Sequence, residues 1–148
     1  MKKPISKKDR FIFIALSMIL IFSIISFILR DALLVNAVES GSVALTKLAL
    51  ITGANPNVWD DGNPLLYWAA VDGNNTEVNL LINKGAKVNI GGEQGETPLM
   101  AAVRNGNNST VELLVSKGAV VRLMNAQKET AINIAVTSKH TDLLKLLR

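Results

Sequence analysis

The chain has 148 residues, enough for one domain with a hydrophobic core, or for a small domain with a membrane anchor. It contains no cysteine, which excludes disulfides, thiolate metal sites and a cysteine nucleophile. The net charge of +4 comes from the first ten residues, since residues 31–148 hold 10 Lys and Arg against 11 Asp and Glu, and this distribution argues against a nucleic-acid-binding surface on the folded part.

A basic tail and a long apolar segment open the chain. Residues 1–10 carry five Lys and Arg against one Asp, and residues 11–29 form a run of 19 without a charge. As a helix this run would span roughly 28 Å, close to the hydrocarbon thickness of a bilayer. Because positive flanks stay on the cytoplasmic side, we expect a cytoplasmic tail at 1–10, a single transmembrane helix (a signal anchor) at 11–29, and a domain at 31–148 outside the cytoplasm.

Two other interpretations of the apolar run stay open. A cleaved signal peptide would be cut best after Val35-Asn36-Ala37, but the run exceeds the roughly 7–15 apolar residues usual in such peptides. Cleavage there would also remove half of a predicted helix, so we favour a retained anchor over secretion. A buried core helix is the weakest interpretation, because no other segment is long enough to surround it.

Three short strings recur after the apolar run at spacings of 32 and 33 residues. They are Gly53-Ala54-Asn55-Pro56-Asn57, Gly85-Ala86-Lys87-Val88-Asn89 and Gly118-Ala119-Val120-Val121-Arg122. This period predicts stacked helical units, since one such unit cannot bury its own apolar face. Each unit is expected to hold two helices, with glycines such as Gly106 at the turn between them and glycines such as Gly118 after the second. Thr97, before Pro98, and Thr130 are predicted to cap the first helices of their units.

Four spacings agree at once in the third unit and the end of the unit before it. Thr97-Pro98-Leu99-Met100-Ala101-Ala102, Gly106, Val111-Glu112-Leu113-Leu114-Val115 and the string at 85–89 together resemble the ankyrin repeat. The resemblance covers about residues 31–148 and implies an all-α solenoid of helix-turn-helix units with short β-hairpin fingers, preceded by the transmembrane helix. We expect four repeats, at about residues 31–58, 59–91, 92–124 and 125–148. The chain departs from the family at Tyr67, Met100 and Asn133, where histidine is usual, and at Arg122, which replaces the closing asparagine.

The resemblance also implies where a protein partner binds, because partners of such proteins meet the finger tips and the turn after the first helix. Carried onto this chain, these positions are Glu39, Asp60, Asp61, Asn63, Trp68, Asp72, Glu93, Gln94, Glu96, Arg104, Asn105, Gln127 and Glu129. Seven of them are acidic and one is basic, while most lysines fall elsewhere. Such a face would attract a partner with a basic surface. The alternative is that exposed loops collect acidic and amide residues without a binding role.

Four other side chains are open to more than one interpretation. Trp68 is equally consistent with an anchor for a partner and with packing against the next repeat. Trp59 is predicted to fill the base of its finger, and Met100 to fill the core. The single histidine, His140, is predicted to be a surface residue of the last repeat.

No group of residues predicts catalysis, since no nucleophile, acid–base pair or metal shell is brought together by sequence spacing. We therefore expect no enzyme, no cofactor, no metal and no small-molecule substrate. The predicted function is that of an adaptor or scaffold, tethered to a bacterial inner membrane and binding a protein in the periplasm. An inhibitor or immunity protein that blocks a periplasmic toxin or hydrolase is one alternative, and a structural subunit of a membrane complex is another.

Overall fold

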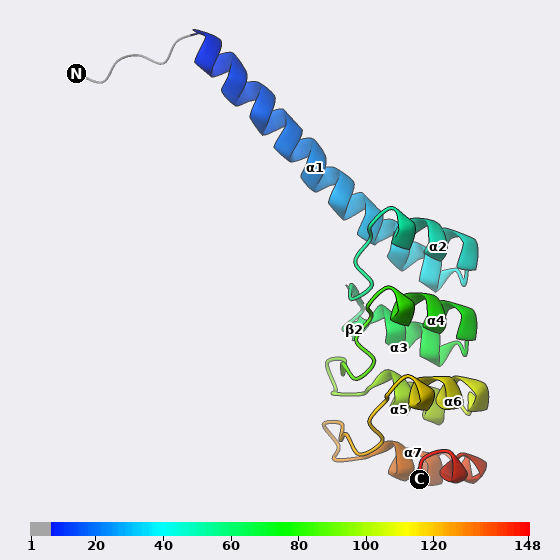
Figure 1. Ribbon diagram of the computed structural model, residues 1–148. Coiled ribbons are helices and arrows are strands. Elements are labelled where there is room, and N and C mark those ends of the chain that lie inside the picture. The colour runs from blue at the N-terminus through cyan, green and yellow to red at the C-terminus, as the bar shows by residue number, and fades with distance from the viewer. Residues whose placement is uncertain (1–6) are drawn as a thin grey trace.

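A long helix leads into a stack of helical pairs (Figure 1). This computed structural model describes the backbone of residues 7–148 and the side chains of residues 12–148. Residues 1–6 of the predicted basic tail therefore lie outside the described residues.

The long helix, α1, runs without a break over Lys7–Glu39. It contains no glycine or proline, so nothing in the sequence bends it between the apolar run and the predicted first helix of the first repeat. The side chains of residues 12–29 are largely exposed, whereas Leu34, Ala37 and Val38 are fully buried in the stack. One helix thus serves both as the apolar segment and as part of the first helical pair.

The other elements form two rows beside each other. In chain order they are α2 (Val43–Ile51), β1 (Trp59–Asp60), β2 (Asn63–Pro64), α3 (Leu65–Val71), α4 (Asn75–Asn83), α5 (Pro98–Arg104), α6 (Asn108–Ser116), α7 (Ala131–Thr137) and the 3-10 helix η1 (Thr141–Lys145). The end of α1 packs on α3, α3 on α5 and α5 on α7, while α2, α4 and α6 form the second row. The predicted fold, a mostly helical solenoid with a short hairpin finger, is confirmed.

The predicted helix caps are present. The Oγ1 atoms of Thr97 and Thr130 each accept a hydrogen bond from the backbone N–H three residues on, both at 3.3 Å. In return, the Thr97 N–H donates to the sulfur of Met100 at 3.5 Å, and the Thr130 N–H donates to Oδ1 of Asn133 at 2.9 Å. Two residues that depart from the family pattern therefore still supply an acceptor that closes the first turn.

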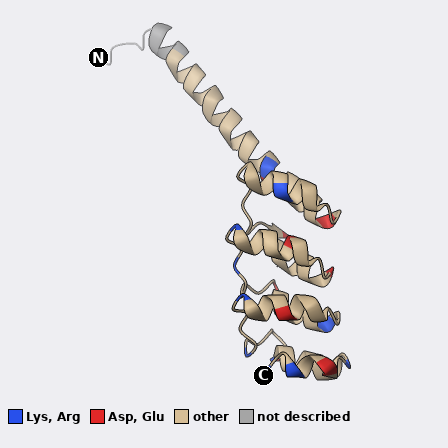
Figure 2. Cartoon of the chain, turned by 45° about the vertical axis from the view of Figure 1, so that its right-hand side comes forward, with Lys and Arg blue, Asp and Glu red and all other residues tan. Residues whose placement is uncertain are grey.

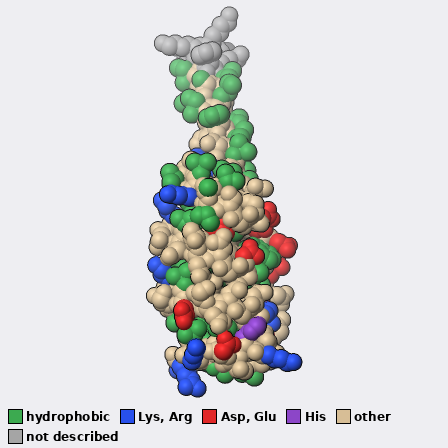
Figure 3. Space-filling view, turned by 90° about the vertical axis from the view of Figure 1, so that its right-hand side faces the viewer, with side chains coloured by type: hydrophobic (Ala, Val, Ile, Leu, Met, Phe, Trp, Pro, Cys, Tyr) green, Lys and Arg blue, Asp and Glu red, His purple; other side chains and the backbone are tan. Residues whose placement is uncertain are grey.

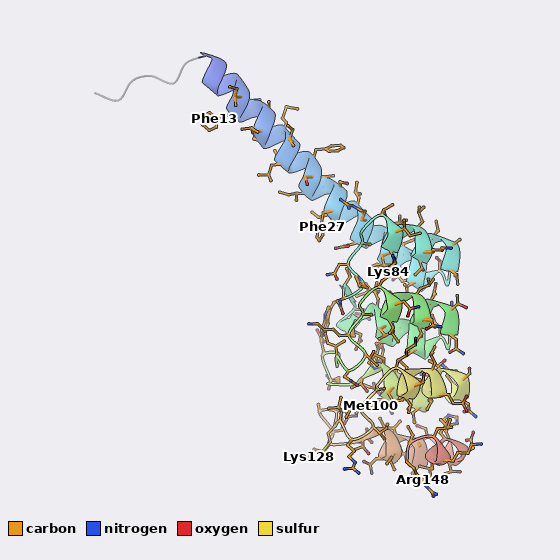
Figure 4. All side chains as sticks on the ribbon, in the orientation of Figure 1. Phe13, Phe27, Lys84, Met100, Lys128 and Arg148 are labelled. Atoms are coloured by element: carbon orange, nitrogen blue, oxygen red, sulfur yellow. The ribbon has the colours of Figure 1, made fainter. Side chains whose placement is uncertain are left out.

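Small side chains let the helices of the first row approach closely. Ala69, Ala70, Ala102 and Ala135 are each fully buried between neighbouring units. Met100 is 1% exposed, which confirms its predicted role in the core (Figure 4). No bulkier side chain would fit at the alanine positions without moving a helix, because interiors are close-packed.

Asparagine side chains join successive units along the loops. Asn57 accepts a hydrogen bond from the Lys87 N–H at 2.8 Å and donates to the Gly85 carbonyl at 3.0 Å. Asn89 repeats both bonds one unit later, accepting from the Val120 N–H at 2.7 Å and donating to the Gly118 carbonyl at 3.0 Å. At the next equivalent position, Arg122 has no acceptor atom in its side chain and cannot accept such a hydrogen bond.

Two aromatic predictions require correction. Trp59 is 46% exposed and does not fill the base of the finger, because it lies on the outer face of the two-residue strand β1. His140 is half-buried rather than a plain surface residue, because its imidazole ring packs over Gly106 of the preceding repeat. A Cβ atom on Gly106 would come within 2.6 Å of that ring, so glycine leaves the space that the ring occupies.

Candidate functional site

Four acidic residues and one tryptophan surround a pocket in the first two repeats. Glu39, Asp60, Asp61, Trp68 and Asp72 line it, and its volume is about 300 Å³. We call this site the acidic pocket. All five residues belong to the predicted partner-binding set. Glu39 ends α1, Asp60 and Asp61 lie on the finger, Trp68 lies within α3, and Asp72 directly follows α3.

The finger that presents two of these carboxylates is a tight hairpin. Trp59 pairs with Pro64 and Asp60 with Asn63 in antiparallel register. The two residues at the tip, Asp61 and Gly62, have φ angles of +43° and +73°. Two successive left-handed residues are the signature of a two-residue turn of type I′, for which Asp-Gly is a preferred sequence. The local sequence therefore places Asp60 and Asp61 at an exposed tip.

Trp68 forms the apolar wall of the acidic pocket. Its ring is half-buried against the core, and its Nε1–H donates to the Asp60 carbonyl at 2.9 Å. The neighbouring Tyr67 ring meets it edge to face, with centroids 5.2 Å apart and planes at 89°. The indole is thus fixed in position, and it both packs on the core and lines the acidic pocket.

Arg104, Glu96 and Glu129, at the third and fourth helical pairs of the stack, form a second, self-paired cluster. Arg104 Nη2 lies 2.8 Å from Glu96 Oε1 and 3.7 Å from Glu129 Oε2. The Tyr67 hydroxyl donates to Glu96 Oε2 at 3.3 Å. Burial, and after it the negative charge of Glu96, raises the pKa of Tyr67, so this hydroxyl stays protonated and keeps donating.

The two clusters differ in how much negative charge they leave for a partner. Within residues 12–148, Arg104 takes part in every ion pair, and both of its partners belong to the second cluster. None of the four carboxylates of the acidic pocket is paired with a cation in that part of the chain. The acidic character predicted for the whole face is therefore concentrated in the first two repeats (Figure 3).

The remaining predicted positions lie on the fingers and turns. The Glu93 N–H donates to the Gly62 carbonyl at 2.8 Å, and the Ala126 N–H donates to the Gln94 carbonyl at the same distance, so neighbouring fingers are joined through their backbones. Gln127 Nε2 donates to Gln94 Oε1 at 3.3 Å. Asn63 and Asn105 use their side-chain amides locally, on the carbonyls of Asp61 and Ala101. None of these residues lines the acidic pocket.

Exposed lysines lie away from the acidic pocket. Lys84 and Lys117 end the second helices of their repeats, and Lys87 lies in the loop that follows α4. Figure 2 shows basic residues along the edge where those helices end, opposite the ends of the helical pairs nearest the acidic pocket. This separation of charge is the arrangement that guides a basic surface toward one side of a protein.

Sequence reasoning missed the internal pairing of Arg104. The 33-residue period that relates Glu96 to Glu129 was visible, and Arg104 follows Glu96 by eight residues, which is one helix and its cap. The sequence does not indicate that the Arg104 guanidinium turns toward both Glu96 and Glu129, because the direction of this side chain depends on how closely α5 and α7 pack.

The lining of the acidic pocket is suited to binding a cationic group. Within the described residues, no group of three or more histidine, aspartate or glutamate side chains could hold a metal ion. His140 packs on Gly106, away from the acidic pocket, whose lining consists of four carboxylates and one indole. A fixed indole beside unpaired carboxylates is instead suited to a cationic side chain.

Comparison with known proteins identifies the repeats. A family model described as ankyrin repeats (3 copies) matches residues 34–125 and 93–148. Together these matches extend from the buried part of α1 to the last residue. A comparison with curated proteins finds no match.

Proposed function

The chain belongs to the ankyrin-repeat family, whose repeats act as protein–protein interaction modules, and from this membership we propose that it binds a protein partner through the acidic pocket while α1 holds it in a membrane. The observation that carries the proposal is the acidic pocket itself. It joins four carboxylates without a cation partner among residues 12–148 to an indole held in place by the core.

The chemistry of the acidic pocket favours a basic segment as the bound group. A lysine or arginine side chain would meet carboxylates on one side and the face or edge of Trp68 on the other, gaining both ion pairing and contact with the aromatic ring. The volume of about 300 Å³ lies at the lower end of the range for ligand pockets and is enough for one or two side chains. Backbone hydrogen bonds join neighbouring fingers before binding, so we expect little conformational entropy to be lost when the partner docks.

The membrane part of the proposal rests on α1. One helix among the described residues is long and apolar enough to cross a membrane, Ile12–Glu39, with a mean hydropathy of 2.9 over its most apolar window and none of that window buried. We propose that residues 11–29 span the bacterial inner membrane with the N-terminus in the cytoplasm and the repeats in the periplasm. The charge difference across the apolar run supports this orientation, since five cations precede it and Arg30 alone follows it closely.

Within this proposal the protein is an adaptor or scaffold for an envelope protein. An inhibitor or immunity protein would use the same acidic pocket to cover a basic active-site region of a toxin or hydrolase, and tethering would raise its effective concentration. The two roles differ in outcome: an adaptor leaves the partner active, whereas an inhibitor abolishes its activity at equal concentration.

The proposal is tested by neutralising the acidic pocket and measuring capture of a protein from envelope fractions. Asp60→Asn with Asp72→Asn changes the charge by +2 and leaves the core untouched, because neither side chain is buried. Glu112→Lys on the exposed side of α6 changes the charge by the same amount and serves as the control. We expect the double variant to bind the captured protein about tenfold or more weakly, and the control to bind normally.

Raising the ionic strength should weaken wild-type binding and leave the double variant little changed, because the charges concerned are solvent-exposed. Equal binding by wild type, double variant and control would show that the acidic pocket is not the binding site.

A further inference from the structure

An apolar face remains uncovered at the membrane end of the stack. Leu45, Leu48 and Ile51 of α2 are 39%, 50% and 62% exposed, and they recur every three residues, so they form one stripe. Figure 3 shows hydrophobic side chains gathered at the end of the stack from which α1 emerges.

The later repeats show why this stripe is unusual. Glu77 and Thr110, which stand 32 and 65 residues after Leu45, are fully buried beneath the preceding unit. Thr46 of the first unit makes a 3.0 Å hydrogen bond with Glu77, which shows that this face of a second helix packs on the unit before it. Ile51 is also unusual, because the residues at the equivalent positions of the next two units, Asn83 and Ser116, are exposed but polar.

The stripe continues into a groove whose other wall is the apolar run. Phe22, Ile25, Ser26, Leu29, Arg30, Leu33, Leu48 and Thr52 line a space of about 670 Å³ between α1 and the end of α2. We call it the apolar groove. Phe22 and Ile25 lie about 8–12 Å along the helix axis before Arg30, toward the centre of the apolar run.

Arg30 fixes the depth of α2 relative to the apolar run. Its Nη1 donates to the Thr52 carbonyl at 2.8 Å, and its Nε donates back to the Ser26 carbonyl at 3.0 Å. The next residue, Asp31, accepts a hydrogen bond from the Asn55 N–H at 2.8 Å. The end of α2 is therefore tied to α1 at the first charged position after the apolar run.

We propose that the C-terminal end of α2 lies in the membrane interface, with Leu48 and Ile51 facing the acyl chains and a lipid chain filling the apolar groove. The inference depends on the proposed membrane-spanning role of α1. If Phe22 and Ile25 are at hydrocarbon depth, the apolar groove opens into lipid, and water does not fill it. Lipid then covers the end of the stripe nearest the apolar run, which no preceding unit covers.

The composition of α2 fits this position. The helix carries no acidic residue, and its one charge is the exposed Lys47. A basic residue beside an apolar stripe is typical of helices that lie at a bilayer surface, where the cation meets lipid phosphates. Arg30, at the same level, still has N–H groups beyond those bound to Ser26 and Thr52, and they are free to reach phosphate oxygens.

The test uses single-cysteine variants of the full-length chain, which has no cysteine of its own. Leu48→Cys and Ile51→Cys carry a spin label and are reconstituted in vesicles of phosphatidylethanolamine and phosphatidylglycerol. Accessibility is measured to oxygen, which concentrates in the bilayer, and to a water-soluble nickel chelate. Ser116→Cys, the position equivalent to Ile51 two repeats later, is the matched control, and Leu20→Cys reports on the anchor.

We expect the nickel chelate to reach the labels at 48 and 51 several-fold less than the label at 116, and oxygen to reach them more. A water-accessible pair at 48 and 51, with the label at 20 in lipid, would overturn this inference and leave the membrane anchor standing. A water-accessible label at 20 would overturn both. Spin–spin broadening at 48 would mean that a second copy of the chain covers the stripe, and would also overturn the proposal.

Discussion

Glu77 is the residue at which polarity and burial conflict most. Its side chain has no exposed surface, Oε1 accepts a hydrogen bond from Thr46 at 3.0 Å, and Oε2 has no hydrogen-bond partner. Burial raises the pKa of this carboxyl group, and the hydrogen bond from Thr46 opposes the shift only in part. The Glu77 carboxyl group therefore lowers the stability of the folded protein at any pH at which it is ionised.

This conflict predicts a pH-dependent effect of Glu77→Gln. Because folding raises the pKa, the wild-type protein is most stable below the pKa of the unfolded carboxyl group, and it loses stability as the pH rises through the folded-state value. Glutamine keeps an acceptor for Thr46 and has no charge to bury. We expect the variant to be more stable than wild type at neutral pH, and the difference to shrink as the pH falls.

The measurement is urea unfolding of the full-length protein in detergent micelles at several pH values, followed by tryptophan fluorescence. Glu112→Gln, at an exposed position on α6, is the control and should show no such pH dependence. A constant difference between Glu77→Gln and wild type from acidic to neutral pH would contradict the account.

The turns between elements show where the last repeat is weaker than the others. Gly41, Gly73 and Gly106 leave the first helix of their units with φ angles between +62° and +69°, and Lys139 stands at the same position with φ +63°. A side chain other than glycine in this left-handed region costs roughly 1–2 kcal/mol. The last unit also ends in a five-residue 3-10 helix where the others have a nine-residue α-helix.

Replacing Lys139 by glycine should therefore stabilise the protein. We expect a gain of about 1 kcal/mol, because relief of strain exceeds the extra entropy that glycine gives the unfolded chain. The gain is measured as a shift of the urea midpoint of the full-length protein. Lys117→Gly is the matched control: this lysine follows a helix with φ −92°, so glycine relieves no strain there and should lower stability slightly. The account would be wrong if both variants changed stability in the same direction.

Much of the fold was predictable at this scale, because turns and caps depend on a few local residues. Gly106 is predicted to lie at a turn, and Thr97 and Thr130 are predicted to cap helices. The structure confirms all three. The exposure of Trp59 was not predictable, since a two-residue strand offers either face to solvent until the neighbouring finger is placed. The continuity of α1 into the first helical pair follows from the sequence, because residues 29–39 contain no glycine or proline to end a helix.

The candidate site was predictable as a set of positions but not as two clusters. The resemblance to the ankyrin repeat implies which finger and turn positions meet a partner, and the five residues of the acidic pocket are among them. Side-chain pairing depends on distances of a few ångströms between α5 and α7, so it could not be seen that Arg104 neutralises part of the face.

The whole molecule has three parts that follow one another: the apolar part of α1, the acidic pocket next to it, and the self-paired cluster of Arg104, Glu96 and Glu129. Phe13 and Phe27 point outward from α1, away from any packed surface (Figure 4). The acidic pocket begins at Glu39, the last residue of that same helix. A bound partner would therefore be held close to the membrane and at a fixed angle to it, because no flexible linker separates the two parts.

Site-specific photocrosslinking in intact cells tests the central claim, that the acidic pocket binds a protein, most directly. A photoreactive amino acid replaces Asp72, which is exposed at the rim, or Ser116, which is equally exposed on α6. The account predicts a discrete crosslinked protein at position 72, reduced when Asp60 is also changed to asparagine, and none at position 116. A crosslink at 116 with none at 72 would show that the chain binds its partner through the opposite face and would contradict the account.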